Sequence, residues 1–230
     1  LSLGADNIFQ PARNVSSIAL LNIETQSPQL LNKSYKGDAS LQTGSFGLLG
    51  ASVNYIQKLN NKIILSLSTD AQRADGQFPF DFKSLDVTEH RKRRNNDLQS
   101  FRGEANLYAN LSPKDELRAK IYYYNSERGV PGSAISYNEY AAERIWNDNI
   151  FGQINYKRKF SNRIEYKVLA RVNHDFMKYQ DRHDDKYEET GGIRDDRFDQ
   201  DEYYLSNMLL YKVTDKISVS VAEDLSYTKL

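Results

Sequence analysis

Residues 117–124 alternate strictly between apolar and polar side chains, which limits this stretch to an extended strand with two unlike faces. One face would carry Leu117, Ala119, Ile121 and Tyr123, and the other Arg118, Lys120, Tyr122 and Tyr124. The alternation ends at Gly129, Pro131 and Gly132. Proline has no N–H for a ladder and glycine accepts positive φ, so a turn or loop is expected there.

Similar alternating segments repeat from Lys36 to the end of the chain, and they predict about nine strands of roughly 10 to 14 residues, longer than the globular norm. Tight turns are expected at residues 60–61, 112–115, 161–162 and 214–215. Between them we expect long charged connections at about residues 74–98, 127–149 and 181–202, with one short early reversal at residues 44–47.

This sorting of connections favours a membrane β-barrel, because an up-and-down meander places alternate connections at the same end, and outer-membrane barrels have short turns at one end and long loops at the other. Apolar content is 39% and mean hydropathy is −0.71. Such averages are typical of soluble proteins, but they also fit a barrel in which only alternate residues face lipid. A soluble β-sandwich is the alternative, and its strands would be shorter.

Aromatic residues are arranged as two belts along the predicted strands. Phe101, Tyr123 and Phe176 lie beside the long connections, and Tyr55 and Tyr156 lie beside the tight turns. Two belts separated by aliphatic residues fit two membrane interfaces. Ordinary cross-strand aromatic pairing is the alternative explanation.

Several chemistries find no support in the sequence. The chain has no cysteine, and 31 basic residues balance 31 acidic ones, which argues against thiolate metal sites and against a nucleic-acid partner. His90, His174 and His183 lack metal-ligand spacing, and no nucleophile elbow or phosphate loop is present. We therefore expect no enzyme activity and no required cofactor.

Ligand-binding residues are expected in the long connections. The first combines phenylalanines with a basic cluster that could contact lipopolysaccharide phosphates or an anionic ligand. The second offers aromatic surface to a bulky ligand. The candidates are Phe78, Phe80, Arg93, Arg94, Tyr137, Tyr140 and Trp146. Solvation of the basic cluster and packing between loops are the alternatives.

The third long connection is acidic and is a candidate calcium site, because clustered carboxylates supply the oxygen ligands that Ca²⁺ prefers. The candidate ligands are Asp184, Asp185, Asp195 and Asp196. Their spacing does not match an EF-hand loop, so a solvated acidic loop remains the alternative.

Four segments of the chain resemble the TonB-dependent outer-membrane receptors. Ser-Glu-Arg-Gly-Val-Pro-Gly at residues 126–132 resembles a family motif at the rim of an early barrel strand. Residues 44–47 resemble the reversal between the first two strands, and residues 21–28 resemble the exit from the plug. Residues 77–80 followed by 93–97 resemble the first long external loop.

The resemblance implies an all-β fold, an antiparallel up-and-down transmembrane barrel of about 22 strands whose lumen holds a plug. Residues 1–30 would be the C-terminal end of the plug domain, and residues 31–230 the N-terminal part of the barrel. Nine strands are a partial barrel with two edges unpaired in hydrocarbon, so the remaining strands are expected elsewhere in the working protein.

The resemblance also implies a function, namely TonB-dependent import of a scarce nutrient across the bacterial outer membrane. Ferric siderophores, cobalamin, haem and glycan fragments are the ligand classes to consider. Expected partners are the TonB energy-coupling complex, acting through an N-terminal region outside this sequence, outer-membrane lipid and lipopolysaccharide, and a surface lipoprotein. The alternatives are a passive porin or adhesin and a soluble carbohydrate-binding β-sandwich.

Overall fold

The regular elements of this computed structural model are all β-strands within the residues it describes, which are 2–3, 19–20, 28, 30, 33–84, 87–132, 141–181 and 194–230. The short strands are β1 (Ser2–Leu3), β2 (Ala19–Leu20), β6 (Pro79–Ser84) and β7 (Val87–Lys92). The long strands are β3 (Tyr35–Gly44), β4 (Leu48–Lys58), β5 (Ile63–Ala74), β8 (Leu98–Ser112), β9 (Asp115–Gly129), β10 (Arg144–Lys159), β11 (Ile164–Asp181), β12 (Arg194–Lys212) and β13 (Ser218–Lys229).

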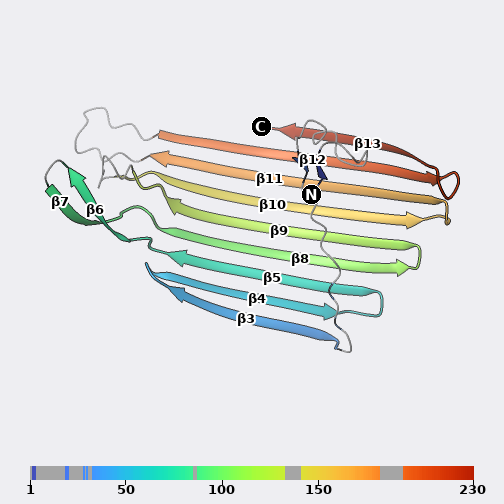
Figure 1. The fold of residues 1–230 in the computed structure, drawn as a ribbon, viewed down its shortest axis with the longest axis horizontal. Coiled ribbons are helices and arrows are strands. Elements are labelled where there is room, and N and C mark those ends of the chain that lie inside the picture. The colour runs from blue at the N-terminus through green and yellow to red at the C-terminus, as the bar shows by residue number, and fades with distance from the viewer. Residues whose placement is uncertain are drawn as a thin grey trace.

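The long strands form one antiparallel sheet of nine strands in the order β13-β12-β11-β10-β9-β8-β5-β4-β3 (Figure 1). Each strand pairs with its neighbour in sequence, except that β5 pairs with β8 because the β6–β7 hairpin lies in the connection between them. The predicted nine-stranded meander is confirmed. A β-sandwich needs two sheets packed face to face, and the long strands of the described residues form a single one.

Five strands are longer than the predicted length of roughly 10 to 14 residues: β8 and β9 by one residue, and the next three by more. β10, β11 and β12 have 16, 18 and 19 residues. The second connection was expected to extend to about Asn149, whereas β10 begins at Arg144, and the third to about Glu202, whereas β12 begins at Arg194. These ends carry polar and charged side chains, on both faces in β12, a composition that suggests a loop, but the backbone ladder continues through them.

The connections sort between the two ends of the sheet as predicted. The β4–β5, β8–β9, β10–β11 and β12–β13 connections are short and lie at one end, which we call the turn end (Figure 1). The longer connections lie at the opposite end, the loop end. The early β3–β4 reversal is also at the loop end, and its Phe46 and Gly47 have positive φ values of 60° and 69°.

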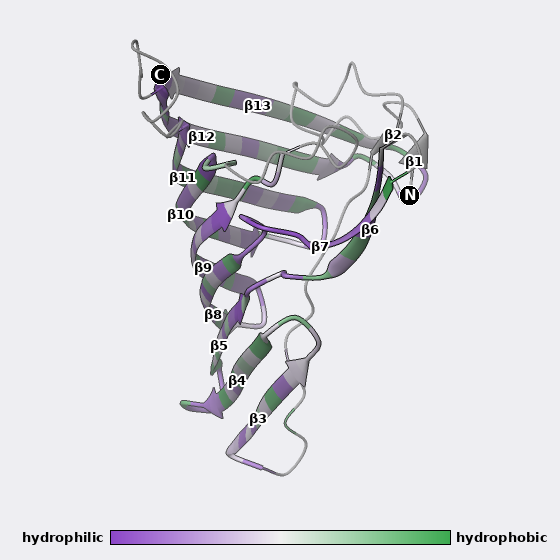
Figure 2. Ribbon diagram, turned by 90° about the vertical axis from the view of Figure 1, so that its left-hand side faces the viewer, coloured by the Kyte–Doolittle hydropathy of each residue, from purple (hydrophilic) through white to green (hydrophobic). Residues whose placement is uncertain are grey.

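The strands are staggered. From Ile63, the first residue of β5, the cross-strand partners are Ala109, Leu117, Tyr156 and then Val168, which lies well inside β11. A barrel can close only when its strands tilt and stagger in this way. Figure 2 shows the resulting sheet as an open, curved wall, with the β6–β7 hairpin on its concave side. The fold is therefore a partial, up-and-down barrel.

The two faces of the sheet show burial opposite to that of a soluble protein. We call the face that carries Ile121 the outer face and the face that carries Tyr122 the inner face. Large apolar side chains are exposed across the outer face, with Ile121 at 61% and Val221 at 69% relative exposure. Others in this set are Leu41, Val53, Leu67, Ile150, Ile154, Val172, Leu205, Leu209 and Leu225.

Polar side chains are buried on the inner face, together with Tyr204 and Met208. Ser126 and Asn173 are 2% and 3% exposed, and Ser100 and Asn106 are buried as well. Side chains converge on the concave side of a curved sheet and spread apart on the convex side, so this difference is expected if the inner face is the concave one. Among the described residues, no large side chain is fully buried, so the sheet has no ordinary hydrophobic core.

Outer-face aromatics gather near the loop end. The Phe101 and Tyr123 ring centroids are 6.1 Å apart, and those of Tyr203 and Tyr227 are 6.2 Å apart. These are cross-strand pairs, and their position near the loop end also agrees with the predicted belt of aromatics beside the long connections. Cross-strand pairing and a membrane-interface belt are therefore compatible explanations. No helix in the described residues is long and apolar enough to cross a membrane.

The N-terminal segment is described only in part. Ala19 and Leu20 form β2 and pair with Leu3 and Ser2 of β1. Most of residues 1–30 lie outside the described residues. The predicted plug boundary therefore stays a prediction.

Candidate functional site

Two of the sequence segments that resemble receptor motifs contact each other at the loop end. Asn95 donates its side-chain amide to the carbonyl oxygens of Val130 at 3.0 Å and Glu143 at 2.8 Å. The Gly129 amide donates to the Asp97 carbonyl at 2.9 Å. Residues 93–97 thus bridge the end of β9 and the start of β10, and we call residues 93–97 with 129–130 and 143–144 the clasp.

Arg144 supplies the charge contacts of the clasp. Its guanidinium donates two hydrogen bonds to the Asp97 carboxylate, at 2.7 and 3.2 Å, and one to Glu127 at 2.9 Å. Such a two-bond contact fixes orientation as well as distance. The hydrogen bond from Arg144 holds the pKa of the Asp97 carboxyl below its usual value, and partial burial opposes this shift.

Close backbone approach explains the glycine at position 129. A Cβ added there would lie 2.5 Å from the backbone and side-chain oxygens of Asn95. Asn95 itself has a positive φ of 50°, a conformation that asparagine accepts more readily than most residues. The clasp therefore depends on these two residue types at these two positions.

The clasp closes the base of the connection between β9 and β10. The Val130 amide donates to the Glu143 carbonyl at 2.9 Å, so the chain leaves and re-enters the clasp at neighbouring points. Arg93 also donates a hydrogen bond to the Gly132 carbonyl. The connection that carries Tyr137 and Tyr140 thus starts and ends on a fixed base.

The predicted phenylalanines lie beside the clasp on the preceding connection. Phe78 packs edge to face against Phe46 of the β3–β4 reversal, with ring centroids 6.0 Å apart. Its carbonyl accepts the Arg93 amide at 2.9 Å. Phe80 is in β6, and Arg91 lies over the Phe82 ring at 4.9 Å. The structure thus brings Phe78 and Arg93 together, with Arg94 next in the chain.

Of the three aromatic residues predicted for the second connection, the structure describes only Trp146. Trp146 lies in β10, in the outer-face register of Ile150 and Ile154, and the Lys178 ammonium lies 4.9 Å from its ring centroid. It is therefore in a strand and not in a loop. Tyr137 and Tyr140 lie outside the described residues.

The predicted acidic site is only partly described. Asp195 and Asp196 are neighbours in β12, so their side chains point to opposite faces. Asp195 pairs with Lys178 and Arg197, whereas Asp196 pairs with Arg194. Asp184 and Asp185 lie outside the described residues, and calcium binding stays a prediction.

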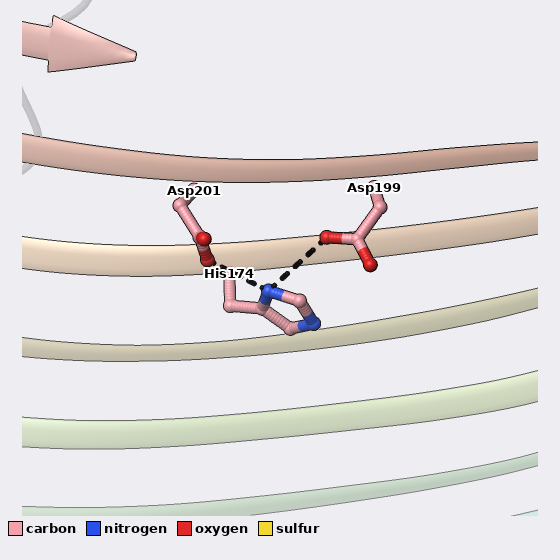
Figure 3. Close-up of side chains that lie close together, drawn as sticks. All are labelled: His174, Asp199 and Asp201. Atoms are coloured by element: carbon pink, nitrogen blue, oxygen red, sulfur yellow. Dashed lines mark hydrogen bonds and ion pairs between the residues drawn. The ribbon is translucent and has the colours of Figure 1, made fainter. Parts of the chain in front are cut away.

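A second cluster of charged groups was not predicted. His174 of β11 lies opposite Asp201 of β12 in the ladder, and Asp199 lies two residues earlier on the same face. The His174 Nδ1 atom is 2.9 Å from Asp201 and 3.6 Å from Asp199, and Figure 3 shows the ring between the two carboxylates. Sequence spacing cannot indicate this cluster, but pairing the apolar residues of β11 with those of β12 would have placed His174 beside Asp201.

The inner face carries a group of cationic and aromatic side chains midway along the strands. Tyr122 and Phe151 stack with centroids 5.0 Å apart. Arg171 lies 4.3 Å from the Phe151 centroid, and Lys120 lies 5.9 Å from it while also pairing with Glu104 at 3.0 Å. This surface can interact with anionic and aromatic groups.

Comparison with known proteins identifies a shared fold. No model of a known protein family and no curated protein matches the chain. Among solved structures, it is similar to the open form of the ferric-catecholate import receptor Fiu from E. coli K12, with a TM-score of 0.58 and 12% sequence identity. The match covers 88% of this chain and 35% of the receptor chain, so the chain spans about a third of that receptor. At this identity the likeness shows the fold alone.

Proposed function

We propose that the chain is the plug end and first barrel part of a TonB-dependent outer-membrane receptor, which imports a large and scarce nutrient chelate. The observation that carries the proposal is the reversed burial of the sheet. Aliphatic side chains cover the outer face, while polar side chains fill the inner face. This pattern is stable when the outer face contacts lipid and the inner face contacts a water-filled lumen, and it would be unstable with water on both sides.

The sorting of connections supports the same proposal. Short turns at one end and long, charged connections at the other are the arrangement of bacterial outer-membrane barrels. On this basis the turn end faces the periplasm and the loop end faces the outside. The clasp and the β6–β7 hairpin would then form part of the external surface that first meets the ligand.

The ligand class is proposed from charge and from the fold neighbour. Arg171 and Lys120 flank Phe151 on the inner face, which favours an anionic ligand with aromatic groups. The structurally similar receptor is named for ferric-catecholate import. Ferric catecholates carry both features and are the first ligands to test, ahead of haem, cobalamin and glycans.

Energy coupling is part of the proposal and separates it from a passive porin or adhesin. The experiment uses cells that carry the complete gene and lack other ferric-catecholate receptors. Uptake of radioactive iron as a ferric catecholate is measured with and without the TonB energy-coupling protein. Uptake that is lost without the coupling protein supports active import, and undiminished uptake would identify a passive pore.

Location is tested separately from transport. Full-length protein should fractionate with the outer membrane. Recovery of the folded protein from the aqueous fraction would exclude the barrel and return the soluble alternative. For the uptake experiment, cells that lack the gene are the control, because they measure the iron that enters by other transporters.

A further inference from the structure

The His174 cluster lies on the outer face of the sheet in the loop-end half of β11, with Val172 on its turn-end side and Phe176 on its loop-end side. Asp201 and His174 are cross-strand partners, and the same row of the sheet contains Ile150 of β10 and Tyr123 of β9. Tyr203 is the next residue of β12 on this face, toward the turn end. β11 and β12 are paired along 18 registered positions, so these side chains project from a fixed backbone. The geometry of the cluster is therefore set by the ladder and not by a loop.

The donor atoms of the cluster have the separations that a small metal ion needs. Zinc bonds to nitrogen and oxygen at about 2.0–2.2 Å, so two ligand atoms in a tetrahedral site are about 3.4 Å apart. The His174 Nδ1 atom lies 3.6 Å from Asp199 and 2.9 Å from Asp201, and all three donor atoms lie within 4.8 Å of one another. A metal ion would replace the hydrogen bond between His174 Nδ1 and Asp201, and the side chains would shift until the donor atoms are about 3.4 Å apart.

The charges of the cluster are unbalanced, which is a separate reason to expect a cation. In the described part of the chain, His174 is the one basic side chain within ion-pair distance of Asp199 and Asp201. Asp195 and Asp196 of the same strand each contact an arginine. Two carboxylates with one neutral or singly charged imidazole carry a net negative charge, and a divalent ion would neutralise it.

The identity of the donors selects the class of metal. Imidazole suits zinc, copper and nickel, whereas calcium and magnesium prefer oxygen ligands alone. The His174 side chain is 42% exposed and that of Asp199 is 65% exposed, so solvent or another ligand can reach the remaining coordination positions. We propose that His174, Asp199 and Asp201 form a binding site for a divalent transition-metal ion of the zinc class.

The test measures zinc binding to the full-length protein in detergent after removal of metals with a chelator. Titration calorimetry is expected to give one saturable zinc site that depends on these side chains. His174→Ala and Asp199→Asn are each expected to weaken it about 10-fold or more, since even outer-shell changes at metal sites cost 10–100-fold. Cobalt is then used as a probe, and its visible absorption band should be lost in both variants.

His90→Ala is the matched control. His90 also contacts a carboxylate, Asp81, but it lies on the β6–β7 hairpin with a single acidic partner. Its removal should leave zinc affinity unchanged. Circular dichroism shows which variants fold. If His174→Ala or Asp199→Asn does not fold, Asp201→Asn is used in its place.

Two outcomes would overturn the inference. One is unchanged zinc affinity in His174→Ala and Asp199→Asn, and the other is equal displacement of zinc by calcium, which would indicate nonspecific attraction to carboxylates. Zinc binding does not require nutrient import. Loss of coupled uptake with zinc binding intact would therefore reject the proposed function and leave the metal site standing.

Discussion

The outer and inner faces of the nine-stranded sheet follow opposite rules, although they are built from the same strands. Ile121 and Tyr122 are adjacent in β9, yet Ile121 is 61% exposed on a face of aliphatic side chains and Tyr122 stacks on Phe151 on a face of polar ones. A soluble sheet would expose the polar face and bury the apolar one. This reversal is the pattern expected if the sheet borders lipid on its outer face, as the proposed function requires.

The largest expected effect comes from a charge on the outer face. Ile121→Lys should cost about 2–4 kcal/mol near the middle of a bilayer and should strongly reduce assembly into the outer membrane. Tyr122→Lys places the same charge one residue away, on the inner face, and should lose only the ring contact, worth about 0.5–1.5 kcal/mol. The measurement is the amount of folded protein in isolated outer membranes. Equal tolerance at both positions would invalidate the assignment of the two faces.

The next effect tests whether the inner face is stabilised by its polar contacts. Asn173 is 3% exposed, accepts a hydrogen bond from Asn149 at 3.0 Å and donates one to Asp175. Asn173→Leu removes both hydrogen bonds from a buried position, leaves Asn149 and Asp175 only the hydrogen bond between them, and should lower the free energy of unfolding by about 1–3 kcal/mol.

Val172→Leu is the control on the outer face and should change the free energy of unfolding by no more than about 0.5 kcal/mol. Denaturant titration of the refolded full-length protein provides the measurement. A stabilising effect of Asn173→Leu would show that the inner face also prefers apolar side chains, and the contrast between the faces would fail.

The clasp lies at the loop end, where the strands and the contrast between their faces end. The next prediction tests whether the clasp holds the base of the β9–β10 connection. Gly129→Ala places a Cβ 2.5 Å from Asn95 and should push residues 93–97 away. Crowding of this kind costs about 1–3 kcal/mol, so hydrogen exchange at the Gly129 and Val130 positions should speed up about 10-fold. Gly152→Ala is the control, because nothing lies within 4 Å of the added Cβ. Equal exchange in both variants would show that the clasp does not hold the loop base.

The smallest effect is a pH dependence of the same clasp. The Asp97 pKa is lowered by the hydrogen bond from Arg144, so the carboxylate stabilises the clasp at neutral pH. This contribution is fully present above the ordinary aspartate value of about 4 and is lost as the pH falls through the lowered pKa. Exchange at the Gly129 amide, corrected for its intrinsic rate, should therefore rise only below about pH 4. Asp97→Asn should remove this rise, and a rise that survives the substitution would assign it to another group.

Local alternation was enough to predict the faces and the meander, because a period of two fixes which side chains share a face. It could not predict contacts between strand ends that depend on long connections. Asn95 meets Gly129 only because the β6–β7 hairpin returns the chain to the loop end. His174 meets Asp201 only through the β11–β12 register, although the two residues are 27 positions apart in the chain.

Charged residues caused the remaining errors of the sequence analysis. Asp195, Arg197 and Asp199 were assigned to a loop, yet they alternate along β12 and pair across the ladder with β11. Charge indicates contact with water but does not by itself end a strand. The lengths of β10, β11 and β12 were underestimated for this reason.

The unequal strand lengths would also give the external rim of the proposed receptor an uneven height. β3 has 10 residues, about enough to cross a bilayer, whereas β11 has 18 and β12 has 19. Eight extra residues at about 3.3 Å each, inclined by about 45°, add roughly 20 Å of wall above the membrane. In the proposed receptor, a bulky solute would therefore meet a low rim at β3–β4 and a high rim at β11–β12.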